Sequence, residues 1–192
     1  KDRENFGRKR LNLSTQEINR LIIDQINILS QIAEKNSMKV THVKPHGALN
    51  NMACENFELA NTIAKSIMHS SKDLIFLVPT GSEMENAGKK LGMKVASEIF
   101  ADRNYEDDGN LVSRSKNHAL ITDPETAKNH VIKMVKNQTL NCYSGKQIPC
   151  DIDSICVHGD GKTAVKTANE IRKGLIKNGV TLRPLDMMSK FA

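Results

Sequence analysis

The chain has 192 residues, of which 39% are hydrophobic and 26% are charged. This composition is ordinary for a folded globular protein and excludes a long disordered segment. No apolar run approaches the roughly 20 residues that a membrane-spanning helix needs. The charged first ten residues contain no apolar signal-peptide core, so we expect a soluble protein with no membrane partner.

The net charge of +6, from 28 Lys and Arg against 22 Asp and Glu, could indicate a nucleic-acid binder. The basic residues are scattered among acidic ones, only 4% of residues are aromatic and Trp is absent, so the stacking platforms of such proteins are not expected. The four cysteines show no CxxC spacing and are expected to pack in the core of a protein in a reducing compartment, by default the cytoplasm. They are Cys54, Cys142, Cys150 and Cys156.

In the first half of the chain, residues 1–13 are polar and predict a loop. Ser14 and Glu17 then form a capping-box pattern, which predicts a helix to about Lys35. Alternating strand and helix patterns follow. They predict strands at 38–43, 74–78 and 94–99, and helices at 55–68 and 83–91.

In the second half, residues 100–114 are polar and predict a long loop, followed by a short strand at 119–121. Asp123 and Pro124 predict the start of a helix that runs through residue 135. Residues 137–150 are ambiguous, and 155–157 are apolar and predict a strand. A last amphipathic helix is expected at 162–177, with Val165 and Ile171 on its apolar face, followed by a strand at 180–182.

This βα alternation predicts a parallel sheet, and both a doubly wound sheet and a (β/α) barrel fit it. A complete barrel needs about 200 residues or more. The chain starts inside a loop and a helix, so we expect a single β/α barrel domain over residues 1–192 that lacks its first unit or two.

Charged and imidazole side chains follow the expected strands, at the edge where parallel α/β proteins bind ligands. Each group has a structural alternative: a polar turn at Lys44-Pro45-His46, an ion pair at Asp102-Arg103, and a helix cap at His158-Gly159-Asp160. Because three such groups come to one edge, the pattern favours a functional site.

Other motifs are weaker. Gly161-Lys162-Thr163 resembles the end of a phosphate-binding P-loop, but the glycine required five residues earlier is Cys156. A helix N-terminus there could still attract a phosphate or a carboxylate. His42, His46 and His158 lack the spacing of a helical metal-binding pair, and no serine-hydrolase elbow is present.

Four segments resemble the LamB/YcsF family: VKPHGALNN at 43–51, FADRNYEDDGNLVSR at 100–114, ICVHGD at 155–160 and FGRKRLNLS at 6–14. The resemblance implies a TIM-like, distorted seven-stranded barrel related to the glycoside hydrolase and deacetylase superfamily. It also implies ATP-dependent opening of 5-oxoproline to glutamate together with B and C subunits. ATP would be bound by this chain or by a partner, and a metal requirement stays open.

The family motifs map onto nine residues of this chain. The expected catalytic residues are His46, Asp102, His158 and Asp160. The expected substrate-binding residues are Lys44, Asn50, Arg103, Tyr105 and Arg114, and no metal ligand is assigned.

The chain departs from the family pattern at two places. The family's amino-terminal Asp-rich strand motif and His motifs are not found here, so the amino-terminal strands of the barrel are expected to be missing. Asn50-Asn51 stands where the family usually shows Tyr-Asn. Two alternatives stay open: a metal-dependent deacetylase or carbohydrate-active hydrolase, and a remnant that only binds partners.

Overall fold

The computed structural model describes residues 2–191, which form two compact units. The first unit contains residues 2–96 and 185–191, and the second contains residues 97–184. The main sheet has the strand order β1-β2-β3-β6, and the chain passes from the first unit to the second within β3 (Val95–Phe100). The single domain expected over residues 1–192 stays a prediction.

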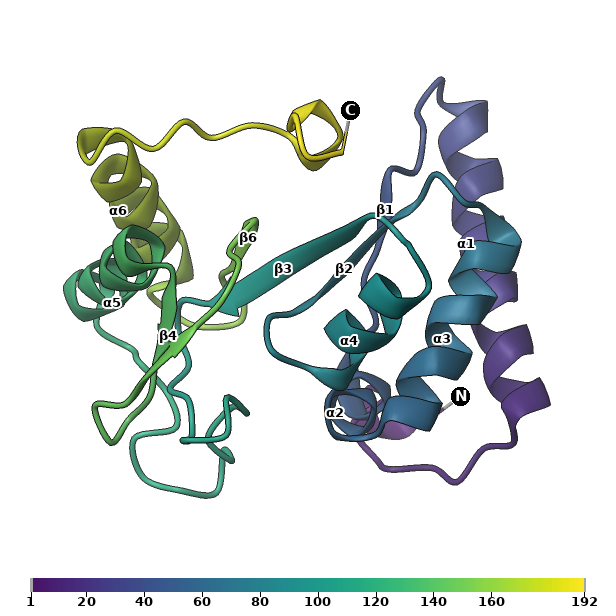
Figure 1. The fold of residues 1–192 in the computed structure, drawn as a ribbon, viewed down its shortest axis with the longest axis horizontal. Helices are drawn as coiled ribbons and strands as arrows, with labels where there is room; N and C mark the ends of the chain where they lie inside the picture. Colours follow the sequence, from purple (N-terminus) through teal and green to yellow (C-terminus); the bar gives the residue numbers. More distant parts are fainter. Residues whose placement is uncertain (1, 192) are drawn as a thin grey trace. The chain divides into compact units, whose positions relative to one another are not determined.

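The first unit packs helices α1 (Thr15–Lys35), α3 (Phe57–Ser70) and α4 (Glu83–Lys90) with strands β1 (His42–Val43) and β2 (Ile75–Pro79) (Figure 1). The predicted capping box at the start of α1 is confirmed. The Ser14 hydroxyl accepts the Glu17 N–H at 3.3 Å, and the Glu17 carboxylate accepts the Ser14 N–H at 2.9 Å. Local side-chain chemistry therefore determines where this helix begins.

The core of the first unit lies between its helices and β2. All five residues of β2 are buried, as the continuous apolar run predicted, and β1 pairs with β2 in parallel. The core includes Ile22 of α1, Ile63 of α3 and Phe76 of β2. The short helix η2 (Leu185–Met187) and Phe191 close the same unit by packing with Ile75, Leu77 and Ala96.

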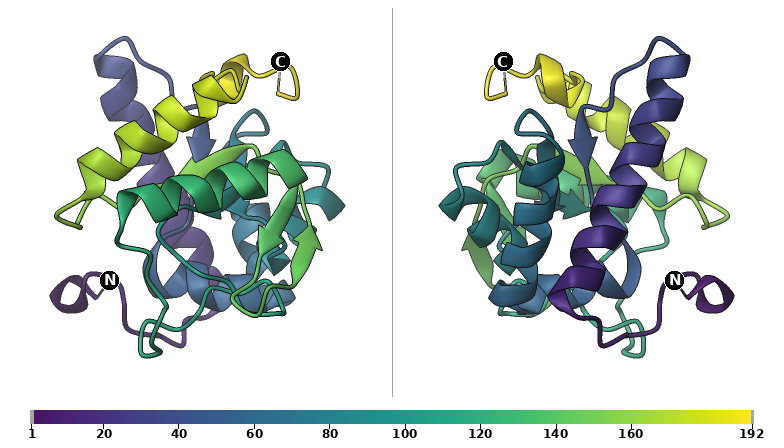
Figure 2. Two further views of the ribbon diagram at one scale, coloured as in Figure 1. Left: turned by 90° about the vertical axis from the view of Figure 1, so that its left-hand side faces the viewer. Right: turned by 90° about the vertical axis from the view of Figure 1, so that its right-hand side faces the viewer.

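The second unit contains the rest of β3, which pairs in parallel with β6 (Ser154–Cys156). Helices α5 (Pro124–Asn137) and α6 (Ala164–Lys177) lie side by side (Figure 2). Asp123 caps α5 as predicted, because its carboxylate accepts the Thr126 N–H at 2.8 Å. The ambiguous segment at 137–150 forms an antiparallel hairpin of β4 (Thr139–Asn141) and β5 (Gln147–Pro149).

One predicted strand is shorter than expected and another does not form, for one shared reason. After α1, the Met38 N–H donates to the Ala33 carbonyl at 2.8 Å, so the chain after the helix caps it and β1 begins only at His42. After α6, the Val180 N–H donates to the Leu175 carbonyl at 3.0 Å, and no strand forms at 180–182. Both are Schellman caps, which use apolar residues just beyond a helix.

Three further predictions differ from the structure. Helix α2 (Gly47–Glu55) forms where the sequence indicated only a polar strand-end segment. The strand expected at 119–121 is reduced to an isolated bridge between Leu120 and Arg103. Val165, expected on the apolar face of α6, is exposed, and the buried positions of that helix are Thr167, Ile171, Gly174 and Leu175.

Candidate active site

Asp102 and His158 meet at the carboxyl ends of two neighbouring parallel strands. Asp102 follows β3 and His158 follows β6, and the register pairs the last residues of these strands, Phe100 with Cys156. The His158 Nδ1 atom lies 2.7 Å from Oδ2 and 2.9 Å from Oδ1 of Asp102. The strand-end argument from the sequence anticipated this meeting.

The carboxylate determines which nitrogen of His158 can act as a base. An ionised carboxylate only accepts hydrogen bonds, so Nδ1 carries the proton and Nε2 keeps a lone pair in the neutral ring. The imidazole stacks on Phe100, with ring centroids 5.8 Å apart and ring planes 19° apart. Hydrogen bond and stacking together hold the ring in one orientation, as a general base requires.

This pair opens onto a cavity of about 210 Å³ in the second unit. Arg114 and Asp160 line the same cavity, so the structure brings four predicted site residues to one place. The remaining wall is formed by residues before α5, by Val157 after β6 and by the start of α6. These residues are Leu120, Ile121, Thr122, Val157, Gly161, Thr163, Ala164 and Thr167. A base, a cation and a helix N-terminus on one cavity can activate water and stabilise negative charge.

Two other predicted site residues are buried in the second unit and hold its long loop. Arg103 donates from Nε to the Ala119 carbonyl at 3.3 Å and from Nη2 to the Val112 carbonyl at 2.6 Å. Burial lowers the pKa of Arg103, and the neighbouring Arg114 guanidinium lowers it further. These contacts fasten both ends of the segment that carries Arg114, and a substrate contact by Arg103 itself stays a prediction.

Tyr105 is only 2% exposed, and its hydroxyl accepts the Phe100 N–H at 2.7 Å. It packs in the core with Ile99, Met134 and Leu140. Burial raises the pKa of the Tyr105 phenol, which keeps the hydroxyl neutral. The structure therefore gives Tyr105 a role in supporting the end of β3, and its expected contact with substrate stays a prediction.

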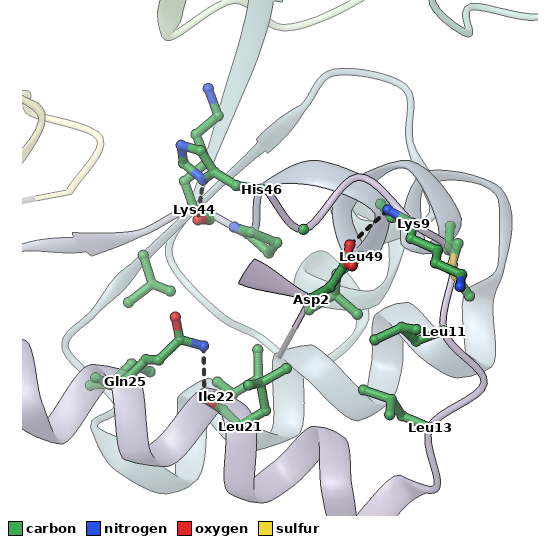
Figure 3. Close-up of a pocket in the computed structure, with 16 residues that line it drawn as sticks. Asp2, Lys9, Leu11, Leu13, Leu21, Ile22, Gln25, Lys44, His46 and Leu49 are labelled. Atoms are coloured by element: carbon green, nitrogen blue, oxygen red, sulfur yellow. Dashed lines mark hydrogen bonds between the residues drawn. The ribbon is translucent and has the colours of Figure 1, made fainter. Parts of the chain in front are cut away.

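Lys44 and His46 lie in the first unit, between β1 and α2. They line a cavity of about 360 Å³ whose wall is largely apolar, with Leu11, Leu13 and Ile22 among its residues (Figure 3). The His46 Nδ1–H donates a hydrogen bond to the Lys44 carbonyl oxygen at 2.8 Å, so Nε2 keeps the lone pair in the neutral ring here too. The two side chains lie next to each other in Figure 3.

Asn50 lies in the first turns of α2 and is buried. Its side-chain N–H donates to the Asn51 side chain at 3.2 Å, while its Oδ1 accepts no hydrogen bond from any residue in the described range 2–191. It does not line the cavity beside Lys44. The expectation that Lys44, His46 and Asn50 share one site with the Asp102–His158 pair stays a prediction.

Thr163, in the Gly161-Lys162-Thr163 segment, lines the cavity at the N-cap of α6, and Thr167, which the sequence did not indicate, lines it from within the helix. The signal that could have found Thr167 is its spacing. Thr167 lies four residues before Ile171 and eight before Leu175, a spacing that places all three on the buried face of α6. A polar residue is unusual on such a face.

Residues 1–190 match the model of the LamB/YcsF family. The chain belongs to the LamB/YcsF family. The A subunit of 5-oxoprolinase from Clostridium beijerinckii is 44% identical over 180 residues, which are 94% of this chain and 71% of that protein. The A subunit of 5-oxoprolinase from Coprothermobacter proteolyticus is 42% identical over 191 residues, which are 100% of this chain and 73% of that protein.

Among solved structures, the lactam utilization protein from Thermus thermophilus superposes on this LamB/YcsF chain with a TM-score of 0.87. It is 32% identical, and the match covers 95% of this chain and 72% of that one. The likeness confirms the expected α/β fold with a parallel sheet. Of the seven strands expected for the family barrel, residues 2–191 supply the four of the main sheet.

Neither a metal-binding cluster nor a membrane-spanning helix is found in the described part of the LamB/YcsF chain. Within residues 2–191, no group of three or more His, Cys, Asp or Glu side chains is arranged to hold a metal ion. No helix in that range combines the length and the apolar character that crossing a bilayer requires.

Proposed function

We propose that this chain is the A subunit of an ATP-dependent 5-oxoprolinase, which hydrolyses 5-oxoproline to glutamate together with B and C subunits. Relatives that bear the name of the 5-oxoprolinase A subunit, at 42–44% identity over nearly the whole chain, support the reaction. The observation that carries the chemistry is the 2.7 Å contact between His158 Nδ1 and Asp102 on a cavity of the second unit.

The reaction adds water to the carbonyl carbon of the lactam ring. His158 Nε2 takes a proton from the attacking water, and the Asp102 carboxylate stabilises the imidazolium that forms. The Arg114 guanidinium stabilises the negative charge that develops on the carbonyl oxygen. When the ring C–N bond breaks, the imidazolium returns the proton to the leaving nitrogen, and the product is glutamate with a free amino group.

The cavity fits a small lactam better than a nucleotide. At about 210 Å³ it lies below the ~300–1,000 Å³ of pockets that hold drug-sized ligands. Cys156 of β6 occupies the position where a P-loop needs its first glycine. ATP, which makes hydrolysis of a stable amide favourable, is therefore assigned to a partner, and no step above passes through it.

The partners and the compartment follow from the same proposal. We expect the B and C subunits in the same compartment as this chain, because the three act together on 5-oxoproline. All four cysteines are free thiols, which fits a reducing compartment, and we place the enzyme in the cytoplasm.

Reconstitution tests the proposed function. The full-length protein is mixed with its candidate B and C subunits, and glutamate release from 5-oxoproline is measured with and without ATP. We expect release only when all the subunits and ATP are present. Release of acetate from acetylated sugars by this chain alone, dependent on a stoichiometric metal, would instead assign it to the deacetylases.

A further inference from the structure

The cavity beside His158 ends at the N-terminus of α6, a helix of 14 residues. The Ala164 N–H donates to the Gly161 carbonyl, and the Thr167 N–H donates to the Thr163 carbonyl. Thr163, the N-cap residue, does not cap the helix with its side chain, because its hydroxyl donates to the Thr122 carbonyl at 3.1 Å. The N–H groups of Val165 and Lys166 thus have no acceptor among residues 2–191.

A second, independent feature lies one turn into the same helix. Thr167 lines the cavity and is only 5% exposed. In the part of the chain that the structure describes, its hydroxyl makes no hydrogen bond. A buried hydroxyl without a partner destabilises a protein unless a ligand or a water molecule binds it.

The cavity is also lined by a cationic side chain and by backbone that no side chain covers. Arg114 lines it and forms no ion pair with any of the described carboxylates. Gly161 lines the cavity, and no atom of residues 2–191 lies within 4 Å of the place where its Cβ would be, so a ligand can approach this backbone closely. Two carboxylates share the cavity: Asp102 is bound to His158, and Asp160 is the opposing charge.

We propose that this end of the cavity binds a phosphoryl group. Its donors are the N–H groups at the N-terminus of α6, where Thr163 and Ala164 line the cavity, together with the Thr167 hydroxyl and the Arg114 guanidinium. Three terminal oxygens can accept from a helix N-terminus, a hydroxyl and a guanidinium at once, whereas a carboxylate has only two. The oxyanion site stands on the geometry, and its assignment to a phosphoryl group derived from ATP rests on the proposed function.

Calorimetric titration of the full-length protein with inorganic phosphate tests the site. We expect Thr167→Val and Arg114→Gln each to weaken phosphate binding by about tenfold, the effect of losing a hydrogen bond to a charged group. Thr167→Val should not lower the thermal midpoint, since the hydroxyl it removes has no hydrogen-bond partner among residues 2–191; a purely structural Thr167 would lower it. The matched controls Thr139→Val and Arg172→Gln should bind phosphate as the wild type does.

Two further arms separate the possible ligands. Asp160→Asn should tighten phosphate binding, because it removes the opposing charge. Displacement of bound phosphate by acetate, a plain carboxylate, at equal concentration would assign the donors to a carboxylate and overturn the phosphoryl assignment. No phosphate binding at millimolar concentration, or equal affinity in wild type, Thr167→Val and Arg114→Gln, would overturn the site itself.

The proposed function is judged separately from this site. ATP-dependent glutamate release by a protein that does not bind phosphate would overturn the phosphoryl site and leave the proposed function standing. Phosphate binding that is sensitive to Thr167 and Arg114, in a protein that releases no glutamate, would leave the oxyanion site standing and remove the proposed function.

Discussion

The backbone of Gly7 lies directly against Gly47 at the start of α2. The Gly7 carbonyl accepts the Ala48 N–H at 2.8 Å, and a Cβ on Gly47 would lie 2.5 Å from that carbonyl oxygen. Gly47 also has a φ of +66°, which disfavours side chains. The glycine after Lys44-Pro45-His46 therefore allows the amino-terminal segment to contact α2 and hold the loop that carries His46.

Gly47→Ala should destabilise the protein more than a positive φ alone explains. The matched control is Gly92→Ala: Gly92 has a φ of +69°, but a Cβ there would meet no atom of residues 2–191 within 4 Å. We expect Gly92→Ala to cost about 1–2 kcal/mol of unfolding free energy, and Gly47→Ala to cost about 1–3 kcal/mol more from the backbone clash. Equal losses of unfolding free energy for the two variants in urea denaturation would show that a Cβ at position 47 does not clash with the Gly7 backbone.

Tyr105→Phe should reduce stability by removing one acceptor. The Phe100 N–H donates to the Tyr105 hydroxyl at 2.7 Å, and a phenylalanine at this position has no hydroxyl to accept that bond. The expected loss is about 0.5–1.5 kcal/mol in unfolding free energy, the net contribution of one hydrogen bond. Tyr143→Phe is the control, since Tyr143 is 60% exposed and stacks on His118 without needing its hydroxyl. A loss no larger than that of the control would argue that the hydroxyl does not support β3.

His130 should make the stability of the protein depend on pH. Burial lowers the pKa of His130, although a hydrogen bond to the Arg103 backbone acts in the opposite direction. The unfolded chain therefore binds a proton at higher pH than the folded one. Stability is fully present above the unfolded pKa, near 6.5, and is lost as the pH falls through it, by at most about 1.4 kcal/mol per pH unit.

Unfolding free energies at about pH 7.5 and about pH 5.5 test this prediction, because ordinary carboxylates stay ionised in that range. We expect the wild type to lose stability on acidification and His130→Gln to lose clearly less. His69→Gln, at an exposed position of α3, should behave as the wild type. The same pH dependence in His130→Gln would remove His130 as the cause.

Features set by short-range chemistry could be predicted from the sequence. The Ser14–Glu17 capping box and the Asp123 cap involve residues three positions apart, and both are confirmed. Helix α2 could not be predicted in this way because its first turn depends on Gly7, about 40 residues away. The strand predicted at 38–43 is shorter than expected and the one predicted at 180–182 does not form, because the Met38 and Val180 N–H groups cap helices.

The candidate site also has parts that could be predicted from the sequence and parts that depend on long-range packing. The meeting of Asp102 and His158 follows from a general rule about the ends of parallel strands, so the sequence sufficed. The burial of Tyr105 and Arg103 depends on how the loop 101–120 folds back on β3, which no local pattern encodes. Thr167 became visible as a cavity residue only when the buried face of α6 was known.

The central claim is that the Asp102–His158 pair activates water in the hydrolysis of the lactam. The most direct measurement is kcat for ATP-dependent glutamate release by the reconstituted enzyme carrying Asp102→Asn or His158→Gln. We expect Asp102→Asn to lower kcat by about 10³–10⁴-fold, because an amide no longer holds the required imidazole tautomer, and His158→Gln to lower it by about 10²–10⁴-fold. The surface controls Asp24→Asn and His69→Gln should keep wild-type turnover. Near-normal kcat in both site variants would contradict the account.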